Sequence, residues 1–140
     1  MKADAINRLM EWTAREEGKR LRMYKCSAGF NTIGYGHNLD AKPISERAAW
    51  VIFEDDIADV VADLDRALPW LWEQPEDVQV ALGDMCFQMG LPGLLKFRKM
   101  LAALERGDRE EAAREALDSA WARQTPARAA RVAALIRGTP

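Results

Sequence analysis

The chain has 140 residues, 49% of them hydrophobic and 30% charged, and a formal net charge of −2. This length fits one domain with its own core, and the composition excludes a disordered or fibrous protein. The small net charge gives no reason to expect a nucleic-acid partner, and two cysteines are too few for a disulfide framework. A reducing compartment is therefore expected.

The N-terminal segment has apolar residues at helical spacing, beginning with Ile6 and Leu9. The pattern predicts a helix over about 5–16, with Asp4 as N-cap and Gly18 as its end. Charged residues interrupt the apolar positions, so we expect no signal peptide and no stable membrane anchor. The chain is accordingly predicted to be made soluble, in the cytosol.

The next segment, about residues 17–44, no longer shows helical spacing of apolar residues. Aromatic and β-branched residues such as Tyr24 and Thr32 stand on either side of the small residues Ser27-Ala28-Gly29, which predicts a short hairpin with a glycine turn. Ser45 then suits the N-cap of a long helix. This helix, about residues 45–68, would be roughly 35 Å long, enough to connect two lobes.

The remaining chain, about residues 70–140, is predicted to be helical. Helices are expected to start at Pro75, after the N-cap Asp108, and at Thr125-Pro126. Helices are expected to end at Gly90 and Gly107, and Pro92-Gly93 is expected to break the chain between two of them. The predicted fold class is α+β and predominantly helical. We expect a single domain over 1–140, in which the long helix joins a small hairpin lobe to a helical lobe that includes the N-terminal helix.

Three residues near the hairpin stand at a specific spacing: Glu17, then Cys26, then Thr32. Glu17 ends the first helix, and the other two lie on or beside the hairpin, so all three could face one cleft between the lobes. Taken alone, Glu17 also fits a solvated charge at a helix end, and Cys26 fits a core thiol. With only one histidine and two distant cysteines, we expect no metal site.

Here the sequence resembles the phage-type lysozymes, the T-even phage endolysin family, also called glycoside hydrolase family 24. The segments that carry the resemblance are Glu17-Gly18 with Leu21 and Tyr24, Gly29, Thr32-Ile33-Gly34-Tyr35-Gly36-His37, Phe87-Gln88-Met89-Gly90 with Phe97, and Trp121 with Gln124-Thr125-Pro126, Arg128 and Arg131. These blocks occur in the family's order and cover almost the entire chain. The resemblance implies a lysozyme-like fold and a peptidoglycan muramidase that needs no cofactor.

The resemblance also implies roles for individual residues. Glu17 matches the general acid, and Thr32 matches the residue that positions the attacking water for inversion at the anomeric carbon. The implied substrate-binding residues are Gly36, His37, Phe87, Gln88 and Arg128. For His37 the family position also implies a structural ion pair with Asp56. The chain is a short member, with only six residues between His37 and Ile44, so we expect a strand and its loop to be missing.

Cys26 stands where most members of the family have Asp. Three roles remain open for it: a thiolate base for water, a thiolate nucleophile, or a neutral thiol that shapes the site. We favour the base, although an unperturbed thiol titrates near about 8.5. Lys25 and Arg128 are candidates for lowering its pKa. The other cysteine, Cys86, lies in an apolar helical pattern and is predicted to be buried.

The leading interpretation is an endolysin that hydrolyses the β-1,4 bond between N-acetylmuramic acid and N-acetylglucosamine to lyse the host cell. Its partner would be the peptidoglycan glycan strand. We expect a monomer in the host bacterial cytoplasm that reaches the wall through a holin-type membrane lesion or is delivered by another machine. One alternative is a catalytically silent relic that binds glycan strands, and a weaker one is an all-helical interaction module.

Overall fold

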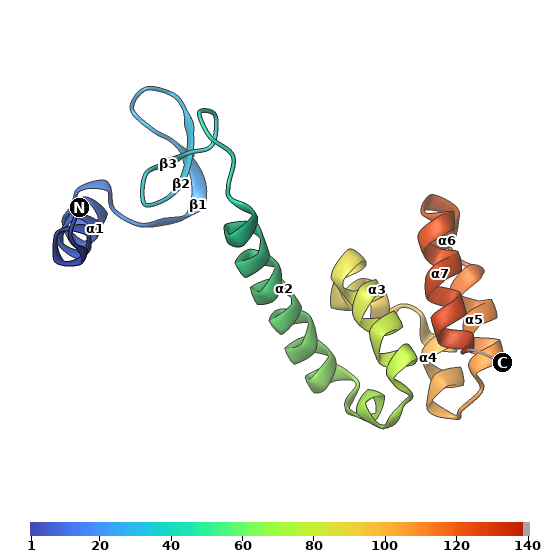
Figure 1. Cartoon of the computed structure of the whole chain (residues 1–140). Helices are drawn as coiled ribbons and strands as arrows, with labels where there is room; N and C mark the ends of the chain where they lie inside the picture. The colour runs from blue at the N-terminus through green and yellow to red at the C-terminus, as the bar shows by residue number, and fades with distance from the viewer. Residues whose placement is uncertain (139–140) are drawn as a thin grey trace. The chain divides into compact units, whose positions relative to one another are not determined.

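The computed structural model describes residues 1–138, which form mostly helices and one small antiparallel sheet (Figure 1). This confirms the predominantly helical α+β class. The chain forms two compact units, Met1–Trp50 and Val51–Pro140. No helix in the described part of the chain is long and apolar enough to cross a membrane.

The first unit begins with a helix that ends where the sequence predicts. Its elements are α1 (Ala3–Glu17), β1 (Arg20–Lys25), β2 (Asn31–Gly34) and β3 (His37–Asn38). Gly18 takes φ +73°, and its N–H donates to the Ala14 carbonyl, so the predicted end is confirmed. The predicted cap is wrong, because the helix starts earlier: Lys2 is the N-cap and Asp4 lies inside the first turn.

The sheet has the order β1-β2-β3, with both pairs antiparallel. Thr32 lies on the central strand, opposite Tyr24 on one side and Asn38 on the other. It is the one buried polar side chain among the residues that the structure describes, with 3% exposed. The predicted hairpin is therefore present as β1 and β2, and β3 adds a short third strand.

The long helix α2 (Glu46–Ala67) begins as predicted, because the Ser45 Oγ accepts the Ala48 N–H at 3.1 Å. A short 3₁₀ helix, η1 (Pro69–Glu73), follows it. The second unit then holds α3 (Glu76–Leu95), α4 (Arg98–Glu105), α5 (Arg109–Leu117), α6 (Ala120–Gln124) and α7 (Pro126–Arg137). Neither η1 nor α6 is predicted from the sequence, since both are too short to show a helical period.

The helix boundaries of the second unit are set by a few residues. Gly90 has φ +78° and ψ 162°, so its backbone is not helical and it separates two helical stretches within α3, in agreement with the helix end predicted there. The Asp108 side chain accepts the Glu111 N–H at 3.1 Å, which confirms the predicted cap of α5. Thr125 is the N-cap of α7 and Pro126 is its first residue, as predicted. The Thr125 hydroxyl makes no cap hydrogen bond to α7 and donates to the Trp121 carbonyl at 3.0 Å.

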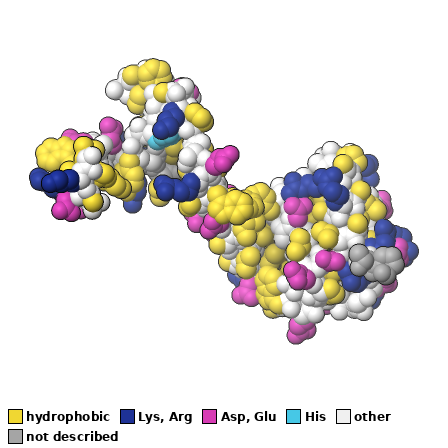
Figure 2. Space-filling model, viewed as in Figure 1, with side chains coloured by type: hydrophobic (Ala, Val, Ile, Leu, Met, Phe, Trp, Pro, Cys, Tyr) yellow, Lys and Arg dark blue, Asp and Glu magenta, His cyan; other side chains and the backbone are white. Residues whose placement is uncertain are grey.

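The buried apolar core belongs to the second unit. Its largest fully buried side chains are Leu64, Leu71, Val78, Leu82, Met85, Leu94, Met100, Leu104 and Ile136. Cys86 is 3% exposed, as predicted, and burial followed by the charge of Asp63 raises the pKa of its thiol. Figure 2 shows hydrophobic side chains along α2, where Ile57 and Val61 remain partly exposed.

Candidate active site

The Glu17 side chain is placed by the end of α1 and by the turn between β2 and β3. Gly36 in that turn has φ +71°, a conformation that favours glycine. A Cβ built on Gly36 would lie 2.6 Å from Oε2 of Glu17 and 2.8 Å from its carboxyl carbon. The bare Cα of Gly36 therefore makes room for the carboxylate.

Cys26 lies in the turn that joins β1 to β2, and backbone hydrogen bonds fix this turn. The Cys26 N–H donates to the Phe30 carbonyl at 2.9 Å, and the Gly29 N–H donates to the Cys26 carbonyl at 2.8 Å. The Thr32 hydroxyl donates to the same Phe30 carbonyl at 2.9 Å. The backbone N–H of Cys26 and the hydroxyl of Thr32 thus donate to the same carbonyl, that of Phe30.

The turn lowers the pKa of the Cys26 thiol below its ordinary value. The largest cause is hydrogen bonding by the Phe30 backbone, followed by the Ala28 backbone, whereas desolvation opposes them. The Thr32 hydroxyl contributes less, and the Gly29 backbone less still. Because a hydroxyl has one proton, Thr32 donates either to the Phe30 carbonyl or to the ionised sulfur, not to both.

His37 begins β3, and its Nε2 lies 3.0 Å from the Lys42 carbonyl oxygen. A carbonyl only accepts, so Nε2 carries the proton in this contact. The ion pair with Asp56 would join the first unit to the second, and it stays a prediction.

In the second unit, Phe87 and Gln88 lie on α3, and each contacts an aromatic side chain of another helix. The Gln88 Oε1 accepts the Trp121 indole N–H at 2.9 Å. The Phe87 ring meets Phe53 edge to face, with 5.7 Å between the ring centroids. Phe87 is 40% exposed, so part of its side chain is accessible.

Arg128 on α7 forms a bidentate ion pair with Asp84 on α3. Its Nε donates to Oδ2 at 2.9 Å and its Nη2 donates to Oδ1 at 2.7 Å. Hydrogen bonding to Asp84 raises the pKa of the Arg128 guanidinium. The two side chains are 37% and 36% exposed, so solvent screens the pair and it adds about 1 kcal/mol or less to stability.

Sequence reasoning missed Asp84 as a functional candidate. A signal was present, because Asp84, Phe87 and Gln88 are spaced so that they share one face of a helix. The structure thus joins Glu17 to Gly36 and Cys26 to Thr32 in the first unit, and it gives Phe87, Gln88 and Arg128 separate partners in the second. That all of them line one cleft stays a prediction. Among residues 1–138, no cluster of His, Cys, Asp or Glu is placed to hold a metal ion.

Comparisons with known proteins place this chain among the lysozymes. The chain is 33% identical to the Pre-baseplate central spike protein Gp5 of Enterobacteria phage T4, over 91% of this chain and 27% of that protein. It is 31% identical to Probable T4-type lysozyme 2 of Dictyostelium discoideum, over 91% of this chain and 92% of the relative. Probable T4-type lysozyme 1 of the same organism is 26% identical, over 94% of both chains.

The alignment with the spike protein also shows how the lengths of the two aligned regions compare. The alignment with the spike protein extends over 156 positions, more than the 140 residues of this chain, so the relative has residues that this chain lacks. The family model for phage lysozyme matches residues 14–137, a range that contains Glu17, Cys26, Thr32 and Arg128. The chain therefore belongs to the phage lysozyme family.

Proposed function

We propose that this protein is a peptidoglycan muramidase, which hydrolyses the β-1,4 bond between N-acetylmuramic acid and N-acetylglucosamine. The observation that carries the proposal is the Glu17 carboxylate held against the bare Cα of Gly36. Small residues let a ligand or a side chain approach the backbone closely. A saccharide laid along this turn would bring its glycosidic oxygen within reach of the carboxyl group.

In the proposed mechanism Glu17 acts as the general acid and Cys26 as the base. Glu17 gives its proton to the glycosidic oxygen as the bond to the anomeric carbon breaks. A water held by Thr32 attacks that carbon from the opposite face and gives its proton to the Cys26 thiolate. The product has inverted configuration. Proton exchange with solvent then returns Glu17 to the acid and Cys26 to the thiolate. The lowered pKa of the Cys26 thiol supports this role, because it increases the thiolate fraction at neutral pH.

Digestion of purified Gram-negative sacculi tests the reaction, with the released ends identified by mass spectrometry. Wild type should release reducing N-acetylmuramic acid ends, and Glu17→Gln should be slower by about 100-fold or more. Glu16→Gln is the matched control, since it removes the neighbouring exposed carboxylate. Anhydro ends would identify a transglycosylase. Binding of wild type to sacculi without release would identify a glycan-binding relic.

We further propose that the protein serves host cell lysis as an endolysin. It would act as a monomer on the wall after a holin-type lesion has opened the inner membrane. Expression alone in a Gram-negative host should leave the culture intact, whereas co-expression of a holin should lyse it within minutes. Expression of Glu17→Gln with the same holin should not lyse the culture. Lysis without the holin would contradict this route.

A further inference from the structure

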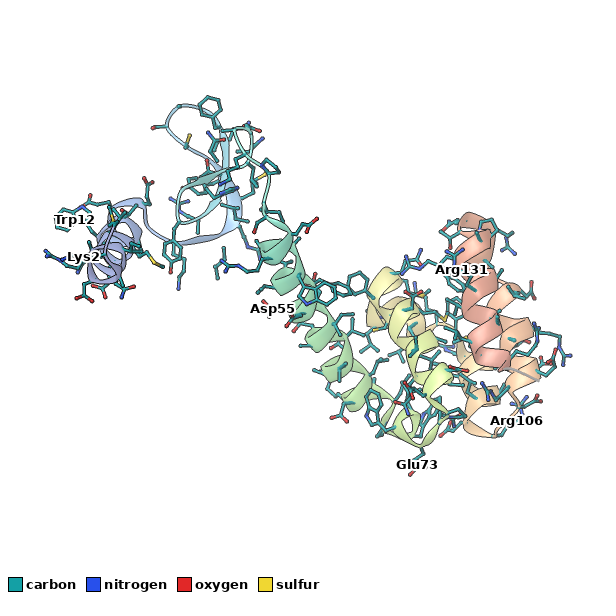
Figure 3. The ribbon with its side chains drawn as sticks, viewed as in Figure 1. Lys2, Trp12, Asp55, Glu73, Arg106 and Arg131 are labelled. Atoms are coloured by element: carbon teal, nitrogen blue, oxygen red, sulfur yellow. The ribbon has the colours of Figure 1, made fainter. Side chains whose placement is uncertain are left out.

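Asp40 lies in the loop between β3 and α2, and its carboxylate accepts hydrogen bonds from the backbone and the side chain of Asn31. The backbone N–H of Asn31 donates to Oδ2 at 2.8 Å, and Nδ2 of the same residue donates to Oδ1 at 3.2 Å. In Figure 3 this loop lies beside the sheet, with the side chains of both drawn as sticks. The two contacts join the loop to the first residue of β2.

Asn38 folds this loop so that the carboxylate of Asp40 reaches Asn31. Oδ1 of Asn38 accepts the backbone N–H of Asp40 and that of Ala41, each at 3.0 Å. Such a turn is one that Asn side chains favour. The Asn31 carbonyl also accepts the Leu39 N–H at 2.8 Å. Asp40 is therefore held in place relative to β2 by its own backbone as well as by its side chain.

The Asn31 N–H belongs to the same peptide group as the Phe30 carbonyl. A trans peptide is planar, with its N–H and C=O pointing in opposite directions, and no peptide bond among the described residues is cis. At its carbonyl end this group accepts from the Cys26 N–H and from the Thr32 hydroxyl, both at 2.9 Å. At its N–H end it donates to the Asp40 carboxylate. A negative charge there polarises the peptide and strengthens the hydrogen bonds at its carbonyl.

We propose that Asp40 is a positioning residue, which fixes the Phe30–Asn31 peptide for the attack of water on the substrate. The carbonyl of this peptide holds Cys26 and Thr32 relative to each other. The inference rests on the proposed function, in which Cys26 is the base and Thr32 holds the water. Displacement of the peptide would also move the Phe30 backbone, which is the largest cause of the lowered pKa of the Cys26 thiol. The reactivity of the thiol therefore reports on the position of the peptide.

Two substitutions of Asp40 distinguish the effect of its acceptor oxygens from the effect of its charge. Asp40→Ala removes both, whereas Asp40→Asn removes the charge and keeps an amide oxygen for the Asn31 N–H. Alkylation of Cys26 by iodoacetamide is measured over a series of pH values in a Cys86→Ala background, which gives the pKa of the thiol without any substrate. Asp40→Ala should raise this pKa and slow alkylation at pH 7 about three- to tenfold, with an unchanged rate at high pH. Asp40→Asn should stay within about twofold of the parent.

The direction of the change is informative, because a nearby carboxylate disfavours a thiolate. Loss of the charge alone would lower the pKa of the thiol and speed alkylation, the opposite of the expected result. Glu46→Gln is the control, since it removes another exposed carboxylate of the first unit, and it should leave alkylation unchanged. Asp40 is exposed, so its substitution leaves no cavity, and circular dichroism should show each variant folded.

Amide hydrogen exchange tests the contact in the unsubstituted chain. The Asn31 N–H should be protected there and in Asp40→Asn, and it should exchange faster in Asp40→Ala. Fast exchange of this N–H in the wild type would overturn the inference. Unchanged or faster alkylation of Asp40→Ala, or equal effects of Asp40→Ala and Asp40→Asn, would also overturn it.

Release of reducing ends from sacculi is measured in parallel with the same variants. Asp40→Ala should release them about tenfold more slowly than the parent, because the water and its base are misplaced. No release by the wild type together with the predicted alkylation pattern would reject the muramidase and keep the role of Asp40 in placing the peptide. Equal release by the parent and Asp40→Ala would keep the muramidase and reject that role.

Discussion

The carboxylate of Glu17 occupies the space that a side chain on Gly36 would need. A Cβ at position 36 would lie 2.6 Å from Oε2 and 3.1 Å from the Cγ of Glu17. The contact joins the end of α1 to the turn between β2 and β3, two places 19 residues apart in the chain. The position of the proposed acid therefore depends on a glycine.

Replacing Gly36 and Gly34 in turn should distinguish the effect of the Glu17 contact on activity from the effect of backbone strain. Gly36→Ala adds a methyl group that displaces the Glu17 carboxylate, and we expect kcat to fall about 100-fold. Gly34→Ala is the matched control, because Gly34 also has φ +71° but has nothing within 4 Å of its built Cβ. Both variants should lose about 1–2 kcal/mol of stability from the left-handed conformation. Equal activity of the two variants would show that the Glu17 contact is unimportant.

The role of Cys26 as a base predicts how activity depends on pH. The thiolate is the active form of Cys26, so the fraction of enzyme with an active base should rise with pH until the pKa of the thiol is passed. Cys26→Asp should be well tolerated, and its carboxylate is already ionised near neutral pH. Dividing the rate of wild type by the rate of Cys26→Asp at each pH removes the effect of other titrating groups that both enzymes share. This ratio should rise by about tenfold per pH unit below the thiol pKa and then level off.

Cys26→Ser and Cys26→Ala complete this series. The serine variant should be much slower than wild type at every pH, because a hydroxyl does not ionise in this range. A Cys26→Ala variant with wild-type activity would exclude both the base and the nucleophile. A glycosyl-enzyme detected by mass spectrometry in the wild type would favour the nucleophile.

We expect the Thr32 hydroxyl to help lower the pKa of the Cys26 thiol. Thr32→Val removes a hydrogen bond that favours the thiolate, so the pKa of Cys26 should rise and its alkylation by iodoacetamide at pH 7 should slow by a factor of about two to five. The effect is small because the Phe30 backbone is the larger cause. A Cys86→Ala background keeps the buried thiol from reacting. Thr32→Ser should restore the rate, and failure to do so would indicate a packing effect.

The fold could be predicted best where one residue decides a helix boundary. Gly18, Ser45 and Asp108 lie where α1, α2 and α5 end or begin, since each acts through local backbone groups. The cap prediction for Asp4 was wrong, whereas Thr125 is the N-cap of α7 as predicted but makes no side-chain hydrogen bond to that helix. The helix begins before Asp4, and Thr125 uses its hydroxyl for the Trp121 carbonyl.

The site could be predicted only in part. The spacing of Glu17, Cys26 and Thr32 identifies candidates, but their contacts depend on turns that spacing does not describe. The space beside Glu17 comes from Gly36, which a different turn supplies. The Asp84–Arg128 pair joins residues 44 apart in sequence, and only tertiary packing of α3 against α7 brings them together.

The end of α7 gives a test of stability that is independent of catalysis. Arg109 donates from Nε to the Ile136 carbonyl at 2.7 Å and from Nη2 to the Leu135 carbonyl at 3.0 Å. These carbonyls belong to the last turn of the helix, where backbone acceptors have no partner within the helix. Arg109 therefore ties the start of α5 to the end of the helix that holds Arg128.

Arg109→Lys keeps the positive charge at the start of α5 but lacks the fork that reaches two carbonyls. We expect a loss of about 1–2 kcal/mol in the free energy of unfolding and a Tm lower by about 3–8 °C. Arg106→Lys is the matched control, because Arg106 makes an exposed ion pair of 3.7 Å with Asp108. Thermal unfolding followed by circular dichroism measures both. Equal Tm values for the two variants would mean that water satisfies the helix end as well as Arg109 does.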